Sequence, residues 1–342
     1  MRSGDSWRVG ARAPARVRAG QPVTLGRVAL DLRQRLVRAV LVGVVLIGLF
    51  VFFFVTPAHD PKPNGLPVVV VGPPAATDPL TQRLEGRDFD VERAESAEAA
   101  RGKIEDRDAY GAFVLAPPAP RVLVATAASV PAAELIEGIA RSAGVRTVVD
   151  VKPTDRDDPR GATLNVFTLA LVITSILTAL VAVQMVPELR ALGPRVAASS
   201  SAAILGGLVA LGIVKAEGAL PGSFVAEVAV VALAVLGIAL SSAGLIRLIG
   251  PAGTGVPFLI FLMLGTPASG LASAPELLPT PWHPLGAFLP PGALGSALRN
   301  VAYFDGAKVV LPLLVLAAYV VIGVILNQIA SRRAEVGPSP AR

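Results

Sequence analysis

The sequence contains no cysteine, only two histidines and few charged residues. Without cysteine there are no disulfide bonds, thiolate metal sites or thiol catalysis, so any domain in an oxidising compartment must be held together by packing. Charged residues make up 16% of the chain and apolar residues 53%, whereas soluble proteins carry roughly 25% charged residues. With a mean hydropathy of +0.63, this composition indicates a membrane protein.

Common catalytic motifs are also missing. The one Gly-Lys pair, Gly102-Lys103, is followed by isoleucine and lacks the upstream glycine of a P-loop, so the chain has no such ATPase motif of its own. His59 and His283 lie far apart in proline-flanked segments, without the spacing of metal ligands. No serine has the flanking glycines of a nucleophile elbow. We therefore expect no enzymatic activity, no cofactor and no metal.

Apolar runs near the length needed to cross ~30 Å of hydrocarbon occur six times. They cover residues 39–55, 164–186, 196–214, 223–246, 254–271 and 309–329. This predicts a multi-pass α-helical membrane protein with about six transmembrane helices. The third run is short and rich in small residues, so it is the run that would not cross the membrane if there were five helices instead of six.

Positive charge gathers before the first run, where the chain has nine arginines: 2, 8, 12, 16, 18, 27, 33, 35 and 38. Lysine and arginine in short loops stay on the cytoplasmic side, so the N-terminus is expected inside a plasma membrane. Counting onward, Arg190 and Arg195, Arg247 and the arginines of the C-terminal tail also fall inside. Membrane topology thus accounts for the basic charge, and we expect no nucleic-acid binding.

The basic segment, residues 1–38, ends in an amphipathic stretch that either lies along the cytoplasmic leaflet or extends the first transmembrane helix, residues 39–56. That first helix is expected to be an uncleaved anchor. The cytoplasmic tail is residues 330–342.

Residues 57–162 differ from the rest in carrying charges of both signs between short apolar runs, with proline-rich hinges at both ends. The pattern predicts strands at 66–71, 89–92, 110–115, 121–125 and 145–151 and helices at 77–86, 96–107 and 131–143. The order β-α-β-α-β-β-α-β favours an inserted extracytoplasmic α/β domain with a partly parallel sheet.

Few polar side chains fall inside the apolar runs of the five-helix part, residues 163–329. Gln184 and Glu227 are candidate intramembrane polar groups, and Glu227 is expected at the membrane interface, where a charge costs little. Between the fifth and sixth runs, residues 274–307 are too polar and proline-rich to cross. We expect an external hairpin on the membrane surface, with Trp282, Phe288, Tyr303 and Phe304 at headgroup level.

The layout of one helix, a large external domain and five further helices resembles the type 2 ABC transporter permeases of the phage-infection-protein-like, actinobacterial branch. The segments LPVVVVGPP, FDVERAESAEAARGKIEDRDAYGAFVL, DDPRGATLNVFTLAL and LPPGALGSALRNVAYFDG are similar to segments of that group. The resemblance covers about residues 40–330.

This resemblance implies the membrane subunit of an exporter, a homodimer surrounded by membrane lipid that works with a separate ATPase subunit to move a lipid, glycoconjugate, drug or polypeptide outward. The candidate contact with the ATPase is Glu188, Arg190 and Arg195. The candidate external gate is Pro290, Pro291, Arg299, Tyr303 and Phe304. The alternative is a membrane-anchored scaffold or binding protein that presents the external domain without transport.

Overall fold

The computed structural model describes residues 25–59, 61–185 and 191–336. The chain divides into two compact units, Met1–Leu49 and Phe50–Arg342. Helix α1 (Leu25–Ala58) begins in the first unit and ends in the second. Helix α1 covers both the end of the basic segment and the first apolar run.

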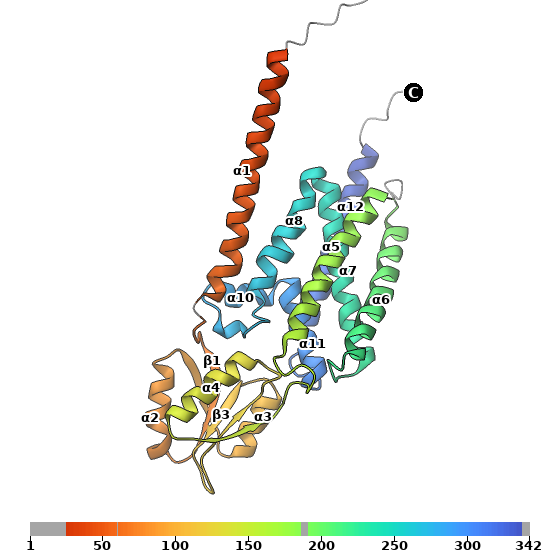
Figure 1. The fold of residues 1–342 in the computed structure, drawn as a ribbon. Helices are drawn as coiled ribbons and strands as arrows, with labels where there is room; N and C mark the ends of the chain where they lie inside the picture. The colour runs from red at the N-terminus through yellow and green to blue at the C-terminus, as the bar shows by residue number, and fades with distance from the viewer. Residues whose placement is uncertain (1–24, 60, 186–190, 337–342) are drawn as a thin grey trace, which may run out of the picture. The chain divides into compact units, whose positions relative to one another are not determined.

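A five-stranded sheet follows α1, with strand order β2-β1-β3-β4-β5 (Figure 1). The central strand β1 (Leu66–Val71) pairs in parallel with β2 (Phe89–Arg93) and β3 (Gly111–Val114). Strand β4 (Arg121–Val124) runs antiparallel to β3, and β5 (Thr147–Asp150) is parallel to β4. The valines of β1 are buried, as expected of a strand covered on both faces.

Three helices cover the sheet. Helix α2 (Pro74–Glu85) packs on β1 and β2, α3 (Ala97–Glu105) on β1 and β3, and α4 (Val130–Ser142) on β3 and β4. Ser96 and Ser129 cap α3 and α4 by accepting backbone N–H groups at 3.0 and 3.1 Å, which fixes where these helices begin. The predicted order of strands and helices is confirmed, and β1 has the predicted bounds.

Four long apolar helices follow: α5 (Ala162–Met185), α6 (Leu192–Ala216), α7 (Phe224–Ile249) and α12 (Val310–Val336). Helix α7 packs against α5, α6 and α12. Polar side chains on the contact between α7 and α12 bond to backbone carbonyls of the facing helix. Ser241 donates to Tyr319 at 2.8 Å and Asn327 donates to Leu240 at 2.9 Å, contacts that hold helices together where water is excluded.

The fifth apolar run is not one regular helix. Its hydrogen-bonding pattern changes from a 3-10 turn (Pro251–Thr254) to a short α8 (Gly255–Pro257), a π-helix (Phe258–Gly265) and a short α9 (Thr266–Ala268). Proline at 267 has no N–H, so regular α-helical bonding cannot continue through this run. Such π-segments often occur at functional positions.

Five helices in the described part of the chain are long and apolar enough to cross a membrane: Arg33–Pro57, Ala162–Met185, Leu192–Ala216, Phe224–Ile249 and Val310–Arg333. The third apolar run, the weakest in the sequence, is the 25-residue helix α6. The fifth run forms a shorter apolar helical segment, Ala252–Ala268, which is not among these five helices. The coarse result is a mostly helical protein with five candidate membrane-spanning helices and one small sheet.

We call the sheet with α2, α3 and α4 the sheet unit, and α5, α6, α7, residues 251–268 and α12 the helix bundle. The turn between α6 and α7 lies at the sheet unit, where the Leu220 N–H donates to Asp155 at 3.0 Å. The fifth run also ends near the sheet unit, because Ser129 donates to the carbonyl of Ser273. Since α7 begins at the sheet unit and ends at the far end of the bundle, residues 251–268 run the length of the bundle.

Candidate functional site

A short helix, α11 (Pro290–Tyr303), joins the sheet unit to the helix bundle. It packs against α5, α7 and α12, and most of its 14 residues are buried. Leu294 and Leu298 belong to the hydrophobic core of the bundle. Phe304, directly after α11, and Leu277, shortly before it, belong to the core of the sheet unit. The segment 274–307 is therefore shared by both cores.

The expected surface hairpin at residues 274–307 is thus wrong in one respect, because its helix is enclosed by protein. Trp282 and Phe304 are buried, whereas Phe288 is 60% exposed. Trp282 lies edge-on against the ring of Phe53, with ring centroids 5.6 Å apart. Apolar residues at helical spacing indicate that a helix has an apolar face, but not whether protein or lipid covers that face.

The predicted gate residues gather at the two ends of α11. Pro290 and Pro291 are buried in its first turn, where missing N–H groups cost nothing. Arg299, Tyr303 and Phe304 lie at its C-terminal end, next to the sheet unit. The structure places these five residues on α11 or directly after it, and four of them are buried while Tyr303 is partly buried, so α11 cannot move without disturbing both cores.

Backbone contact holds the start of α11 in place. A Cβ atom added at Gly286, in the short helix α10 (Trp282–Ala287), would lie 1.8 Å from the carbonyl oxygen of Ala268. A Cβ added at Gly292 would lie 2.1 Å from the carbonyl oxygen of Gly286. Only glycine permits such approach, so the end of the fifth run, α10 and α11 form one closely packed corner.

Asp155, in the hinge after the sheet, connects three parts of the molecule. Its Oδ2 atom accepts the Tyr303 hydroxyl at 2.8 Å and the Leu220 N–H at 3.0 Å. The same hinge starts α5, because Asp158 accepts the backbone N–H groups of Ala162 and Thr163, both at 2.9 Å. The hinge therefore ties α11, the α6–α7 turn and α5 to the sheet unit.

A buried ion pair lies beside this hinge. Lys215 Nζ is 2.8 Å from Glu227 Oε2, and the Glu227 side chain is fully buried. Lys215 also donates to the carbonyls of Leu220 and, at 2.9 Å, Gly222. Neither carboxylate oxygen of Glu227 makes a hydrogen bond of regular geometry within the described residues, so Lys215 compensates Glu227 by charge. The contact to Oε2 is thus the main compensation for burying this carboxylate.

The two candidate intramembrane polar residues have different environments. Protein encloses Glu227 at the sheet-unit end of the bundle, and its expected position at the membrane interface stays a prediction. Gln184, near the other end of α5, is exposed. Lys215 directly follows the third apolar run, and its ion pair with Glu227 compensates its partly buried charge.

A cationic group lies between α3 and the end of α11. Arg107 donates to the Asn300 side chain at 2.8 Å, and its guanidinium carbon is 5.0 Å from the centre of the Phe304 ring. Arg299 is buried and donates to the Leu271 carbonyl at 3.3 Å. Burial, and then the nearby charge of Arg107, lower the pKa of Arg299 to about 10, so it stays charged at neutral pH.

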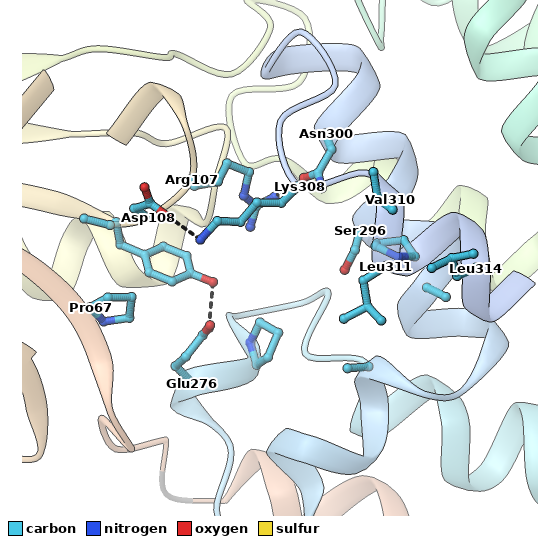
Figure 2. A pocket seen from close by; sticks show the side chains of 17 residues that line it. Pro67, Arg107, Asp108, Glu276, Ser296, Asn300, Lys308, Val310, Leu311 and Leu314 are labelled. Atoms are coloured by element: carbon cyan, nitrogen blue, oxygen red, sulfur yellow. Dashed lines mark hydrogen bonds and ion pairs between the residues drawn. The ribbon is translucent and has the colours of Figure 1, made fainter. Parts of the chain in front are cut away.

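Two further pairs complete the contact between the sheet unit and residues 274–312. The Tyr110 hydroxyl donates to Glu276 at 2.7 Å, and Lys308 lies 2.5 Å from Asp108 (Figure 2). Burial, followed by the negative charge of Glu276, raises the pKa of Tyr110. Tyr110 is therefore a neutral donor over the physiological pH range.

These groups surround a cavity of about 620 Å³ between the sheet unit, α11 and the start of α12. Figure 2 shows Arg107, Asp108, Glu276, Asn300 and Lys308 around it, with aliphatic side chains of α12 on another side. Those aliphatic residues, Val310, Leu311 and Leu314, are 53–66% exposed. We call this space the junction cavity. It has a charged wall and an apolar wall, which suits an amphipathic molecule better than a purely polar one.

The predicted ATPase contact consists of three residues, of which the structure describes Arg195. Glu188 and Arg190 lie outside the described residues. Arg195 is only 8% exposed and donates to Ser331 of α12 at 3.0 Å. The contact with an ATPase subunit stays a prediction, and the structure adds that Arg195 also joins α6 to α12.

Sequence reasoning missed most of the polar residues of the junction, among them Arg107, Asp108, Asp155, Glu276 and Lys308. Their partners are distant in sequence, 148 residues apart for Asp155 and Tyr303. For the ion pair the sequence does contain a pattern: Lys215 directly follows the third apolar run, and Glu227 lies near the start of the fourth. Opposite charges on either side of a short turn indicate a candidate pair.

Within the described ranges, no group of three or more histidine, aspartate or glutamate side chains could hold a metal ion. No protein-family model matches this chain, and no curated protein or solved structure matches it. Its function must therefore be argued from the junction and the bundle.

Proposed function

We propose that the chain is the membrane-spanning permease subunit of an ABC-type exporter, moving an amphipathic molecule such as a lipid or glycoconjugate outward with a separate ATPase subunit. The observation that carries the proposal is the junction cavity, which has a charged wall from the sheet unit and an apolar wall from α12. A molecule leaving the bilayer needs such a site, because its polar and apolar parts require different surroundings at the same moment.

The proposed topology has six crossings, with residues 251–268 as the fifth and both termini in the cytoplasm. Two observations support it. Residues 251–268 connect the far end of α7 to the corner beside α11, and lysine and arginine favour the cytoplasmic side. In this topology the sheet unit and the junction cavity lie outside, and the interrupted run is enclosed by protein, where irregular backbone is tolerated.

Helix α11 is the element we propose to couple the bundle to the junction cavity. It contributes Ser296 and Asn300 to the cavity wall, and its other face packs on α5 and α7. A rearrangement of the bundle driven by a partner ATPase would therefore change the shape of the cavity. Packed interfaces usually switch between discrete arrangements rather than deform continuously.

The test starts with purification in mild detergent and identification of copurifying proteins by mass spectrometry. We expect a P-loop ATPase subunit, and a homodimer of this chain by light scattering. The reconstituted complex should move a fluorescent lipid out of the inner leaflet in an ATP-dependent manner. A Ser296→Trp variant, which places a large ring in the junction cavity, should lower that rate at least tenfold.

The matched control is Val225→Trp. Val225 is 77% exposed on α7 and does not line the junction cavity, so the same ring added there should leave transport unchanged. If no ATPase copurifies and no ATP-dependent movement is measured, the exporter is refuted and the membrane-anchored scaffold becomes the better interpretation. Equal loss in both tryptophan variants would refute the role of the junction cavity alone.

A further inference from the structure

Two basic residues of the junction cavity have a backbone conformation that is unusual for their type. The φ angles of Arg107 and Lys308 are 62° and 51°, in the left-handed region that asparagine, aspartate and histidine adopt more readily. Arg107 lines the cavity from the sheet unit and Lys308 from the turn before α12 (Figure 2). Glycine would be less strained at either position. Strained residues tend to occur at binding sites, so these two side chains call for a role in binding.

Arg107 still has donors to offer a ligand. Its Nη1 atom donates to Asn300 at 2.8 Å, and its guanidinium carbon lies over the Phe304 ring. Within the described ranges no carboxylate pairs with Arg107, and its Nε and Nη2 atoms have no hydrogen-bond partner. Because the side chain is only partly buried, these donors are accessible from the cavity. A guanidinium group suits phosphate oxygens especially well, since it meets them in a forked geometry.

Lys308 can take part at little cost. Its ion pair with Asp108 is 56% and 45% exposed, and exposed pairs contribute little to stability. Lys308 can therefore exchange Asp108 for an oxygen of a ligand. Because Asp108 directly follows Arg107 in the chain, the same pair keeps Lys308 close to Arg107 (Figure 2).

The charges around the cavity leave an excess of positive charge. The two carboxylates of its wall already have donors, Asp108 from the ion pair and Glu276 from the Tyr110 hydroxyl. Arg107 has no carboxylate partner in the described part of the chain, and neither has the buried Arg299. Burial, and then the positive charge of Arg107, lower the pKa of Arg299, so the two guanidinium groups repel each other. A negatively charged ligand group on this wall would relieve the repulsion.

The apolar wall of the cavity suits a hydrocarbon chain. Val310, Leu311 and Leu314 line it and are 53–66% exposed. They begin a helix that is apolar enough to cross a membrane, so a chain lying on them would continue into hydrocarbon. The volume of about 620 Å³ falls within the ~300–1,000 Å³ range of small-molecule sites, which leaves room for a headgroup and the first part of a chain.

We propose that the junction cavity binds an amphipathic molecule whose polar end carries a phosphate group and a net negative charge. Arg107 holds the phosphate, Lys308 leaves Asp108 to join it, and the hydrocarbon chain lies along the start of α12. This names the substrate class of the proposed exporter, and it rests on that function only in calling the ligand a substrate, because binding itself needs neither ATP nor a partner subunit.

The test is native mass spectrometry of the full-length protein in detergent without ATP, titrated with phosphatidylglycerol or with phosphatidylcholine of the same chain length. Wild type should bind phosphatidylglycerol about tenfold more tightly. Arg107→Gln should remove that preference, and Arg107→Lys, which keeps the charge but not the fork, should retain part of it. The matched control is Arg101→Gln on α3. Arg101 pairs with Glu105 and does not line the cavity, so this variant should keep the preference.

A second variant separates binding from folding. Lys308→Gly relieves a φ of 51° and gives up only an exposed ion pair, so it should unfold at a higher temperature than wild type. It should nevertheless bind phosphatidylglycerol about threefold more weakly, because the phosphate loses one of its two cations. Glycerol phosphate, which has the anion and no chain, should not bind at concentrations at which phosphatidylglycerol saturates.

The proposal fails if Arg107→Gln keeps the wild-type preference, or if Arg101→Gln loses it equally, which would show only unspecific attraction. Unchanged phosphatidylglycerol binding in Lys308→Gly would remove Lys308 from the site. Tight binding of glycerol phosphate would identify a free-phosphate site instead. ATP-dependent transport that treats both lipids alike would refute the anionic substrate and leave the exporter. Arg107-dependent binding without transport would refute the exporter and leave the site.

Discussion

The buried pair Lys215 and Glu227 gives the sharpest quantitative prediction. Lys215→Met removes the charge and keeps the length of the side chain. It leaves the Glu227 carboxylate fully buried without its cationic partner, and uncompensated burial of this kind costs about 3–5 kcal/mol of folding free energy. Glu227→Gln should lower the free energy of unfolding by only about 1–2 kcal/mol. In this variant Lys215 still donates to two backbone carbonyls and is 24% exposed to solvent.

The diagnostic variant carries both changes, Lys215→Met with Glu227→Leu. Replacing a buried ion pair by apolar residues is often neutral or stabilising, so the double variant should be more stable than Lys215→Met alone. The measurement is thermal unfolding in detergent, followed by the loss of the monodisperse peak in size-exclusion chromatography. Arg101→Met is the control, because its pair with Glu105 is 47% and 39% exposed and should contribute less than about 1 kcal/mol.

Two outcomes would refute this reasoning. If the double variant is destabilised by the sum of the two single changes, the residues are not energetically coupled. If Glu227→Gln is as damaging as Lys215→Met, the carbonyls of Leu220 and Gly222 do not compensate Lys215. Either result would mean that the pair does not hold the α6–α7 turn as its geometry indicates.

Two further predictions concern the junction. The free energy of unfolding should fall as the pH rises above about 10, the ordinary pKa of tyrosine. The pKa of Tyr110 is raised in the folded state, so the unfolded state loses this proton first and is favoured at alkaline pH. Tyr110→Phe removes this proton and should make the free energy of unfolding depend less on pH in that range. Ser129→Ala removes both the α4 cap and the bond to the Ser273 carbonyl, so it should lower the free energy of unfolding by about 2–3 kcal/mol. Ser96→Ala removes a cap alone and should cost about 1 kcal/mol.

The sheet unit could be predicted from the sequence because its signals are local. A run of four valines, Val68 to Val71, specifies a buried strand, and serines at 96 and 129 mark helix starts. These preferences act within a few residues, so they can be recognised without knowing the rest of the fold. The long apolar helices could be predicted for the same reason, since hydropathy alone specifies them.

The junction could not be predicted, because its contacts join distant segments. Arg107 and Asn300 are 193 residues apart, and Tyr110 and Glu276 are 166 apart. Each of these residues alone resembles an ordinary surface residue. The bonds between them arise only after both the sheet and the bundle have formed, so no local pattern contains them.

The fifth apolar run shows a related limit. Hydropathy measures how apolar a segment is, but proline and the surrounding protein decide whether its backbone bonds stay regular. Residues 251–268 combine a π-helix with a close contact to α11, where Gly265 lies against Pro291. The helix α11, which joins the two cores, therefore packs against the least regular part of the bundle, and the proposed exporter would transmit a rearrangement of the bundle to the junction cavity through this contact.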